Sequence, residues 1–298
     1  NTKNKTVIEN YAGNKAYSMD VKSELLQRVS TWLVNEPNFY GDTQDETSSI
    51  QYLIKSVAKK DPEFILKLAC YCRDYLNLRT APVILLVEAS LIDECKPFVR
   101  KYTPSVIKRA DQLTEVIAYL KLRIGNIGDL KESGSMPSSL KKGLADSFEN
   151  FNEYHFSKYN RDDAVKMRDV VNLVHPKPRD ESRSRLYKSI LENTLAVPET
   201  WETIISERGA SRESWEYAST KMGYMALLRN LSNFLTHNCN MKPILEKLTD
   251  PKRIAESKQL PFRFYSALKK VSETESFESN KVVTALSDAL DVSVANVQ

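Results

Sequence analysis

Prolines that precede apolar-periodic segments limit the possible folds of this sequence more than any other feature. Proline cannot continue a helix, but its fixed φ angle favours the first helical position, after a residue that caps the helix. We therefore expect a helix to begin at each of seven pairs: Asp61-Pro62, Ala81-Pro82, Thr103-Pro104, Val197-Pro198, Lys242-Pro243, Asp250-Pro251 and Leu260-Pro261. No strand-like alternation separates these segments, so the chain is predicted to be all-α.

The expected architecture is an irregular α-solenoid of HEAT-like helical hairpins. Helices of roughly 10–16 residues that follow one another through short turns pack as stacked hairpins. The sequence contains only 8 glycines, which argues against a β architecture, and 41% of its 298 residues are hydrophobic, enough for a large core. No exact repeat is found, and such a stack must close on itself or cap its ends. A short β-hairpin turned at Gly13-Asn14 is the one expected exception.

Motifs that the sequence lacks argue against several classes of protein. No Walker-type or GxGxxG loop is present, and His155, His175 and His237 lie in no recognisable nucleophile motif, so we predict no enzyme activity. The four cysteines show no zinc-ligand spacing and are expected to be free thiols, so neither a metal nor a cofactor is predicted. No signal peptide or membrane-spanning run occurs, which favours a cytoplasmic protein without membrane contact. The net charge of +4 is compatible with a nucleic-acid partner.

The region from residue 139 to residue 178 is expected to form two helices, each with one apolar face. Leu140, Leu144, Phe148 and Phe151 recur at three- and four-residue intervals, as on one face of a helix. Ala164, Met167, Val171 and Val174 do the same on a second helix, with Asp162 or Asp163 as its N-cap.

Polar donors and an aromatic ring accompany these two helices. Arg168, Asn172 and His175 fall on one strip of the second helix, beside its apolar face. Donors flanked by an aromatic ring suit a phosphate backbone with an unstacked base nearby. The candidate RNA-binding residues are Lys141, Lys142, Lys158, Tyr159, Arg161, Lys166, Arg168, Asn172, His175 and Lys177. Two alternatives stay open: Lys141 and Lys142 are also typical of a solvated face, and a lone His at a helix end is typically a cap.

Two segments that flank this region are expected to be surface loops on its rim. Residues 123–138 contain three of the eight glycines, and residues 177–186 alternate in charge. Both loops could follow an RNA duplex, and a solvated charged loop is the alternative.

Five segments in order resemble the TROVE module of the Ro autoantigen family, and the resemblance covers nearly the whole chain. They are residues 80–89 (TAPVILLVEA), 112–122 (QLTEVIAYLKL), 139–178 with its KYN and LVHPKP motifs, 222–235 (MGYMALLRNLSNFL) and 261–271 (PFRFYSALKKV). The resemblance implies a non-catalytic RNA-binding protein whose helices curve into a ring or horseshoe. It also implies small noncoding Y-like RNA on a basic outer face, single-stranded 3′ ends of misfolded RNA in the ring hole, and a role in noncoding RNA quality control. An exoribonuclease is a further expected partner.

Single residues take a role from the resemblance only where they match its motifs. His175 matches the His of the family's LxHxKP motif, which contacts Y RNA, and Lys158 matches the lysine of its KY pair. Arg161 lies near a basic position of the family's turn, but this turn is shorter and continues into Asp162-Asp163. In the helix expected at 222–235, Arg229, Asn230 and Asn233 are candidates for contacts in the ring hole. Their alternative is a network that braces neighbouring helices, because buried polar groups need partners.

Residues 1–298 are therefore expected to form one TROVE-like RNA-binding domain. The chain begins at Asn1 without Met and ends at Gln298, which suggests a piece of a longer protein. The family often carries a following von Willebrand A domain that holds a divalent ion, and its motif is not found in this sequence. A protein–protein scaffold is the alternative function, because stacked helical hairpins commonly present peptide-binding surfaces.

Overall fold

The computed structural model describes residues 7–31, 43–124, 136–159 and 164–295. The chain forms two compact units, residues 1–197 and residues 198–298, and each is described by itself. The described residues contain 18 α-helices and, apart from one short hairpin, no β-sheet. The predicted all-α class, built from packed helical hairpins, is confirmed.

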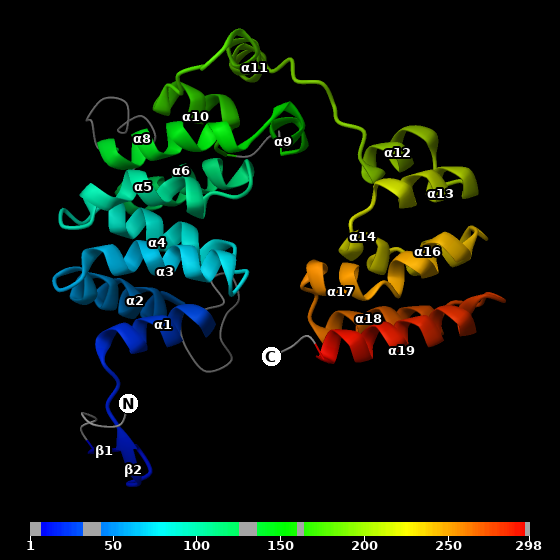
Figure 1. The fold of residues 1–298 in the computed structure, drawn as a ribbon, viewed down its shortest axis with the longest axis horizontal. Coiled ribbons are helices and arrows are strands. Elements are labelled where there is room, and N and C mark those ends of the chain that lie inside the picture. Colours follow the sequence, from blue (N-terminus) through cyan, green and yellow to red (C-terminus); the bar gives the residue numbers. More distant parts are fainter. Residues whose placement is uncertain (1–6, 32–42, 125–135, 160–163, 296–298) are drawn as a thin grey trace. The chain divides into compact units, whose positions relative to one another are not determined.

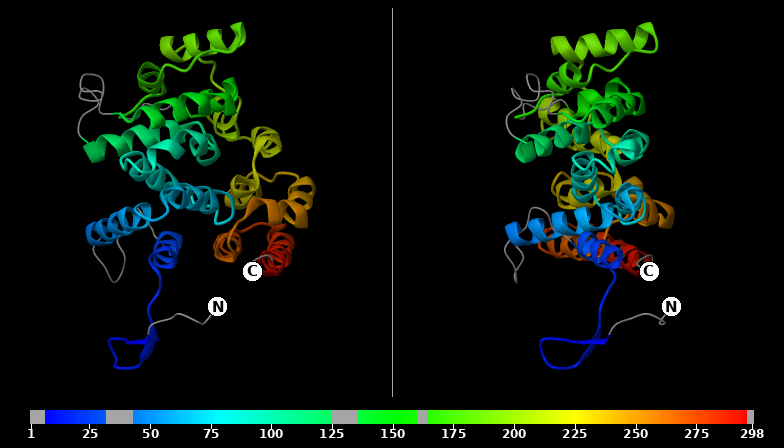
Figure 2. Two further views of the ribbon diagram at one scale, coloured as in Figure 1. Left: turned by 60° about the vertical axis from the view of Figure 1, so that its left-hand side comes forward. Right: turned by 90° about the vertical axis from the view of Figure 1, so that its left-hand side faces the viewer.

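The first unit stacks its helices in successive layers (Figure 1, Figure 2). A β-hairpin precedes them, with strands β1 (Val7–Glu9) and β2 (Lys15–Tyr17) paired antiparallel and Gly13 at φ +75° in the turn, as predicted. The helices are α1 (Val21–Thr31), α2 (Thr43–Ala58), α3 (Pro62–Asp74), α4 (Thr80–Ser90), α5 (Lys96–Val106), α6 (Asp111–Ile124), α8 (Ser138–Ser147), the 3₁₀ helix η1 (Phe148–Asn150), α9 (Glu153–Lys158), α10 (Met167–Val174) and α11 (Glu181–Glu192). The first five helices each lie against the next, α5 packs on α8, and α6 packs on α4 and α10.

Helix α4 is the centre of this unit's core, because every residue from Ala81 to Ser90 is buried. The buried stretch includes Glu88, only 3% exposed, whose carboxylate accepts hydrogen bonds from Gln51 of α2 (3.0 Å) and from Tyr119 of α6 (2.8 Å). Arg123 of α6 neutralises its charge, with Nη2 3.2 Å from Oε2. A buried carboxylate is tolerated only with such partners, so Glu88 ties three helices together.

The second unit packs its helices around a separate core (Figure 1). They are α12 (Trp201–Arg208), α13 (Arg212–Lys221), α14 (Tyr224–Arg229), α15 (Leu231–Thr236), α16 (Met241–Leu248), α17 (Pro251–Ser257), α18 (Pro261–Ser272) and α19 (Ser279–Ala295). Trp215 packs its ring edge against Phe234 at 5.7 Å between centroids, and Phe264 is fully buried. Trp215 is therefore a packing anchor of this core.

The prolines open helices at some of the predicted pairs but not at all of them. Helices α3, α17 and α18 begin at Pro62, Pro251 and Pro261. The expected start at Pro104 is wrong, because Pro104 lies in the last turn of α5, which Pro97 opens instead. The start at Pro198 is also wrong, because α12 begins at Trp201 after a Thr200–Thr203 capping box. Pro104 removes one intrahelical hydrogen bond, and α5 ends two residues later, so a proline marks a helix end as well as a helix start.

Candidate nucleic-acid interface

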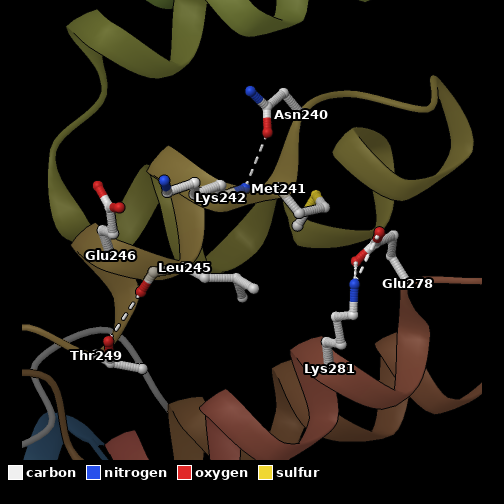
Figure 3. Close-up of a pocket in the computed structure, with 8 residues that line it drawn as sticks. All are labelled: Asn240, Met241, Lys242, Leu245, Glu246, Thr249, Glu278 and Lys281. Carbon is white, nitrogen blue, oxygen red and sulfur yellow. Dashed lines mark hydrogen bonds and ion pairs between the residues drawn. The ribbon is translucent and has the colours of Figure 1, made fainter.

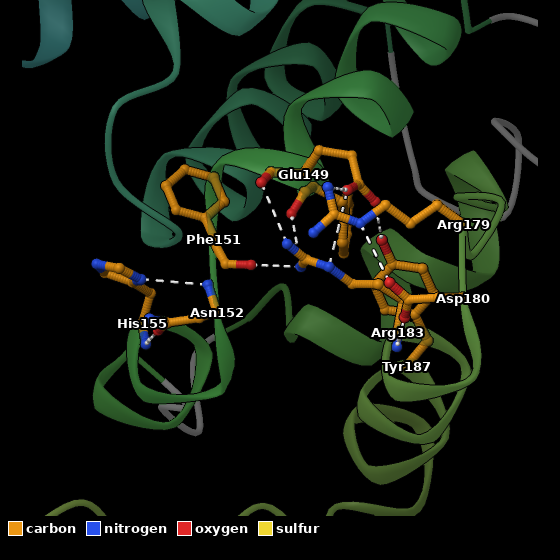
Figure 4. A network of polar contacts seen from close by, with 9 residues as sticks. Glu149, Phe151, Asn152, His155, Arg179, Asp180, Arg183 and Tyr187 are labelled. Carbon is orange, nitrogen blue, oxygen red and sulfur yellow. Dashed lines mark hydrogen bonds and ion pairs between the residues drawn. The ribbon is translucent and has the colours of Figure 1, made fainter.

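The short helix α9 carries Lys158 and is held in place by aromatic packing. Leu140, Leu144, Phe148 and Phe151 are all buried, as the spacing predicts. Phe156 of α9 stacks on Phe148 with ring centroids 5.4 Å apart, and this fixes the helix against the turn that follows α8. Asn152 and His155 cap its N-terminus: each backbone N–H donates to the other's side chain, both at 3.2 Å (Figure 4). His155 therefore has a structural role.

Helix α11 is attached to the same turn through one arginine. The Arg183 guanidinium donates to the carbonyl oxygens of Phe148 (3.3 Å), Glu149 (3.2 Å) and Phe151, and its side chain is only 11% exposed (Figure 4). Tyr187 donates to the Glu149 carboxylate at 3.2 Å, and burial together with this carboxylate raises the pKa of Tyr187 to about 12. Carbonyls at a helix end lack intrahelical donors, so Arg183 satisfies groups that would otherwise be unpaired.

This network corrects the loop expected at residues 177–186. Helix α11 begins at Glu181, capped by Asp180, whose carboxylate accepts the Arg183 N–H at 2.8 Å. Alternating charge suggested a solvated loop, but Arg183 points inward and the next arginine, Arg185, points outward. Of the other expected rim loop, residues 125–135 lie outside the described residues.

Helix α10 presents the predicted donors on its outer side. It begins at Met167, later than expected, and the Asp169 carboxylate accepts the Lys166 N–H at 2.9 Å. The expected caps Asp162 and Asp163 lie outside the described residues, and Ala164 precedes the helix. Met167, Val170, Val171, Leu173 and Val174 are buried, whereas Arg168 and Asn172 are exposed. One face is thus fixed in the core, and the opposite face is open to a ligand.

His175 caps α10 with its backbone and leaves its ring exposed. Its φ of 52° and ψ of 61° are left-handed, and its N–H donates to the Val171 carbonyl at 3.0 Å. Within the described ranges the imidazole makes no hydrogen bond, and the residue is exposed. The two interpretations of His175 are therefore compatible, since the backbone performs the capping and the ring stays available.

The remaining candidates of the first unit differ in accessibility. Lys158 is exposed, and its Nζ lies 5.8 Å from the ring centres of both Tyr154 and Tyr159. Lys142, Arg168 and Lys177 are exposed and have no carboxylate partner in the part of the chain that the structure describes, whereas Lys141, Tyr159 and Lys166 are half-buried. Arg161 lies outside the described residues.

The predicted ring-hole residues lie at a break between two helices of the second unit. The single helix expected at 222–235 is interrupted at Asn230, which separates α14 from α15. Asn230 is 8% exposed and its amide donates to the Ala226 carbonyl at 2.8 Å, while Asn233 donates to the Asn230 side chain at 2.8 Å. These two amides brace the break, and Arg229 is exposed.

One hollow in the second unit contains none of the predicted residues. It has a volume of about 430 Å³ and lies beside α16 and the start of α19 (Figure 3). Lys281 in its wall is paired with Glu278 at 3.1 Å, and Thr249 donates to the Leu245 carbonyl at 3.0 Å. Its wall carries charges of both signs, Lys242 and Lys281 with Glu246 and Glu278, so it favours neither an anion nor a cation.

The described residues contain neither a cluster of metal-binding side chains nor a helix that could span a membrane. They contain no group of three or more His, Cys, Asp and Glu side chains that could hold a metal ion. The cysteines Cys70, Cys72, Cys95 and Cys239 are free, and burial raises the pKa of each thiol to about 11. No helix in the described ranges has the length and apolar character needed to cross a bilayer.

Replacing His175 by glycine should stabilise the end of α10 while removing the exposed imidazole. Glycine adopts positive φ without strain, so we expect a gain of up to about 1 kcal/mol in the local opening free energy. Hydrogen exchange at the α10 amides measures it. His175→Ala is the matched control, since it removes the same ring without relieving the left-handed backbone. Equal protection in both variants would contradict the assigned conformation.

Comparison with known proteins identifies relatives of both units. A family model described as the TROVE domain matches residues 16–196 and residues 193–297. Telomerase protein component 1 from Mus musculus is 25% identical to this chain over an alignment of 337 positions. The alignment covers 85% of this chain. The same protein from Rattus norvegicus is 25% identical over 329 residues, which cover 83% of it. The chain spans only 13% and 12% of the lengths of these two relatives.

A solved structure supports the fold. The crystal structure of the Deinococcus radiodurans RO (RSR) protein aligns with a TM-score of 0.65 at 17% identity. The alignment covers 94% of this chain and 65% of the bacterial one.

Proposed function

Because this chain belongs to the TROVE-domain family, whose members are RNA-binding ribonucleoprotein components, we propose that it binds small, structured, Y-like noncoding RNA. The site is the outward side of α8, α9 and α10 with the segment that follows α10. We define this interface by Lys142, Lys158, Arg168, Asn172, His175 and Lys177, with Lys141, Tyr159, Arg161 and Lys166 beside them.

The observation that carries this proposal is the contrast between the two sides of α10. Its inner face is buried, whereas Arg168 and Asn172 are exposed and the His175 imidazole makes no hydrogen bond in the described part of the chain. Donors on a fixed scaffold suit the phosphate and ribose oxygens of an RNA strand, because little conformational freedom is lost on binding. Lys158 beside the Tyr154 and Tyr159 rings adds a charge next to surfaces on which a base can stack.

A second binding mode completes the proposal. Single-stranded 3′ ends of misfolded RNA would contact Arg229 and Asn233 of the second unit, with Asn230 supporting them. The protein then acts without catalysis in the quality control of noncoding RNA in the cytoplasm, where an exoribonuclease would process the RNA that it presents.

A protein–protein scaffold is the competing function, and a salt titration separates the two. RNA binding releases counterions, so the logarithm of the affinity should fall with the logarithm of salt concentration by roughly 0.7–0.9 per neutralised phosphate. An apolar peptide groove would show much weaker dependence. Fluorescence anisotropy of a labelled stem-loop RNA with a single-stranded 3′ tail measures the slope for the whole chain.

The variant Lys158→Ala/His175→Gly should weaken binding of this stem-loop RNA by more than about 1 kcal/mol. Both side chains are exposed, and glycine keeps the cap of α10, so helicity should not change. Lys59→Ala, an exposed lysine beyond the end of α2, is the control and should bind as the unaltered chain does. Unaltered RNA affinity in the folded double variant would remove the assignment of the site.

A further inference from the structure

Three arginines from different parts of the first unit converge beside the proposed interface. Arg73 lies in the last turn of α3, Arg79 directly before α4, and Arg109 two residues before α6. Burial and the like charges of Arg109 and Arg79 lower the pKa of the Arg73 guanidinium, which places the three cations within Coulombic reach.

One buried glutamine holds the loops that carry these arginines. Gln112 is 1% exposed, and its Nε2 donates to the Arg79 carbonyl at 3.3 Å. Its Oε1 accepts the backbone N–H groups of Lys108 (2.9 Å) and Arg109 (3.1 Å). Arg73 Nη1 donates to the Leu78 carbonyl at 3.2 Å, so all three arginines belong to one hydrogen-bonded frame.

The negative charges near this arginine cluster are already engaged or in a poor position to compensate it. The Asp111 carboxylate accepts hydrogen bonds from Nε and Nη2 of Arg109, with Nε 2.9 Å from Oδ1. The Asp74 carboxylate forms an ion pair with Lys108 at 3.4 Å. Glu115 also faces the cluster and is exposed, but its carboxylate forms no ion pair with any of the three arginines among the described residues.

Two groups are left to receive an anion. The Nε of Arg73 is buried and has no acceptor in the described ranges, and Arg79 is exposed without a carboxylate partner there. A buried donor without an acceptor costs free energy in the unliganded protein, and an arriving anion would recover it.

The cluster also borders the proposed interface directly. The Arg109 guanidinium lies 4.9 Å from the centre of the Tyr159 ring, and Lys158 lies 5.8 Å from the same ring. Tyr159 therefore connects the arginines to the lysine that the RNA is proposed to contact.

We propose that Arg73, Arg79 and Arg109 form a phosphodiester-binding site that extends the RNA interface across the ends of α3 and the starts of α4 and α6. The planar guanidinium fork matches two phosphate oxygens, whereas an ammonium acts as a point charge. This inference rests on the proposed function, since it names a further RNA backbone contact. Arg79 supplies the exposed fork, Arg73 Nε the buried donor, and Arg109 holds Tyr159 at the border.

The first test compares Arg79→Gln with Lys60→Gln in the whole chain. Each variant removes one exposed positive charge, but Lys60 lies at the opposite end of α3, a helix of 13 residues and hence about 20 Å long. We expect Arg79→Gln to bind the labelled stem-loop RNA about fivefold or more weakly and to lower the salt slope by roughly 0.7–0.9, with Lys60→Gln nearly unchanged.

The second test uses inorganic pyrophosphate and needs no RNA. Pyrophosphate should raise the melting temperature of the unaltered chain and of Lys60→Gln more than that of Arg79→Gln. If RNA affinity and the pyrophosphate shift are both unchanged in Arg79→Gln, the arginine site is overturned. The proposed function still stands in that case if Lys158→Ala/His175→Gly binds RNA weakly. If the chain binds no RNA but its pyrophosphate shift depends on Arg79, the anion site stands and the RNA function fails.

Discussion

Replacing Arg183 by methionine should destabilise the attachment of α11 by about 3 kcal/mol or more. The guanidinium is the shared donor for three backbone carbonyls at the end of η1 and also lies 3.7 Å from the Glu149 carboxylate. Methionine preserves much of the packing but supplies no donor, so each of the three carbonyls would lose one hydrogen bond. The Glu149 carboxylate would keep Tyr187 and Arg179 as partners. Hydrogen exchange of the α11 amides and of residues 148–151 measures the loss.

Arg185→Met on the same helix is the matched control for Arg183→Met. Arg185 is 74% exposed and pairs only with Glu181 at 3.0 Å, so its loss should change stability by less than about 0.5 kcal/mol. Similar exchange rates in the two variants would show that the Arg183 contacts contribute little to the position of α11.

The second large effect is expected for Gly143→Ala, which should destabilise the packing of α5 on α8 by about 1–3 kcal/mol. A Cβ atom at Gly143 would lie 2.5 Å from Thr103 Oγ1, 2.7 Å from Thr103 Cβ and 3.2 Å from the Arg100 Cα. Thr103 is fully buried and donates to the Val99 carbonyl at 2.7 Å, so it cannot rotate away without losing that hydrogen bond. The two helices would have to separate, and thermal unfolding should report the cost.

The control for this substitution is Gly223→Ala, where an added Cβ meets nothing within 4 Å. This change should cost less than about 1 kcal/mol, since alanine is only a poorer N-cap there. In a Thr103→Ala background the cost of Gly143→Ala should fall but not vanish, because the Cβ contact remains. If Gly143→Ala destabilises the Thr103→Ala variant as much as it destabilises the unaltered chain, the clash is not with the Thr103 side chain.

The buried faces of the helices were predicted from the apolar spacing more accurately than the helix ends were predicted from the prolines. The apolar residues predicted for α8 and α10 are buried, except Ala164, which precedes α10 and is exposed. The single helix expected from Leu140 to Phe151 ends at Ser147, yet its apolar residues all reach the core, because periodicity reports which side meets the core. Helix α4 is buried from Ala81 to Ser90. The helix start predicted at Pro104 was wrong because, in sequence, a proline near a helix end resembles a proline at a helix start. The break at Asn230 was missed because a buried polar side chain between two apolar turns leaves the period unchanged.

The candidate site was predictable only where its residues are close in sequence. Lys158, Arg168, Asn172, His175 and Lys177 lie within one segment, and all are exposed, as RNA contact requires. The left-handed backbone of His175 has no sequence signal, because a residue before proline is ordinarily extended.

Arg183 and the arginine cluster depend on tertiary contacts that sequence reasoning did not reach. Arg183 resembled a solvated charge because its neighbours alternate in sign. The Gln112 side chain joins the backbones of Arg79 and Arg109, and Arg73 donates to the Leu78 carbonyl beside Arg79. No local pattern in the sequence marks these contacts.

Photo-crosslinking of the whole chain to a stem-loop RNA containing 4-thiouridine, followed by peptide mapping, tests the central claim most directly. The account predicts crosslinks concentrated in residues 154–159 and 172–178, and their loss in Lys158→Ala/His175→Gly. Crosslinks that avoid both segments, or that persist unchanged in this variant, would contradict it.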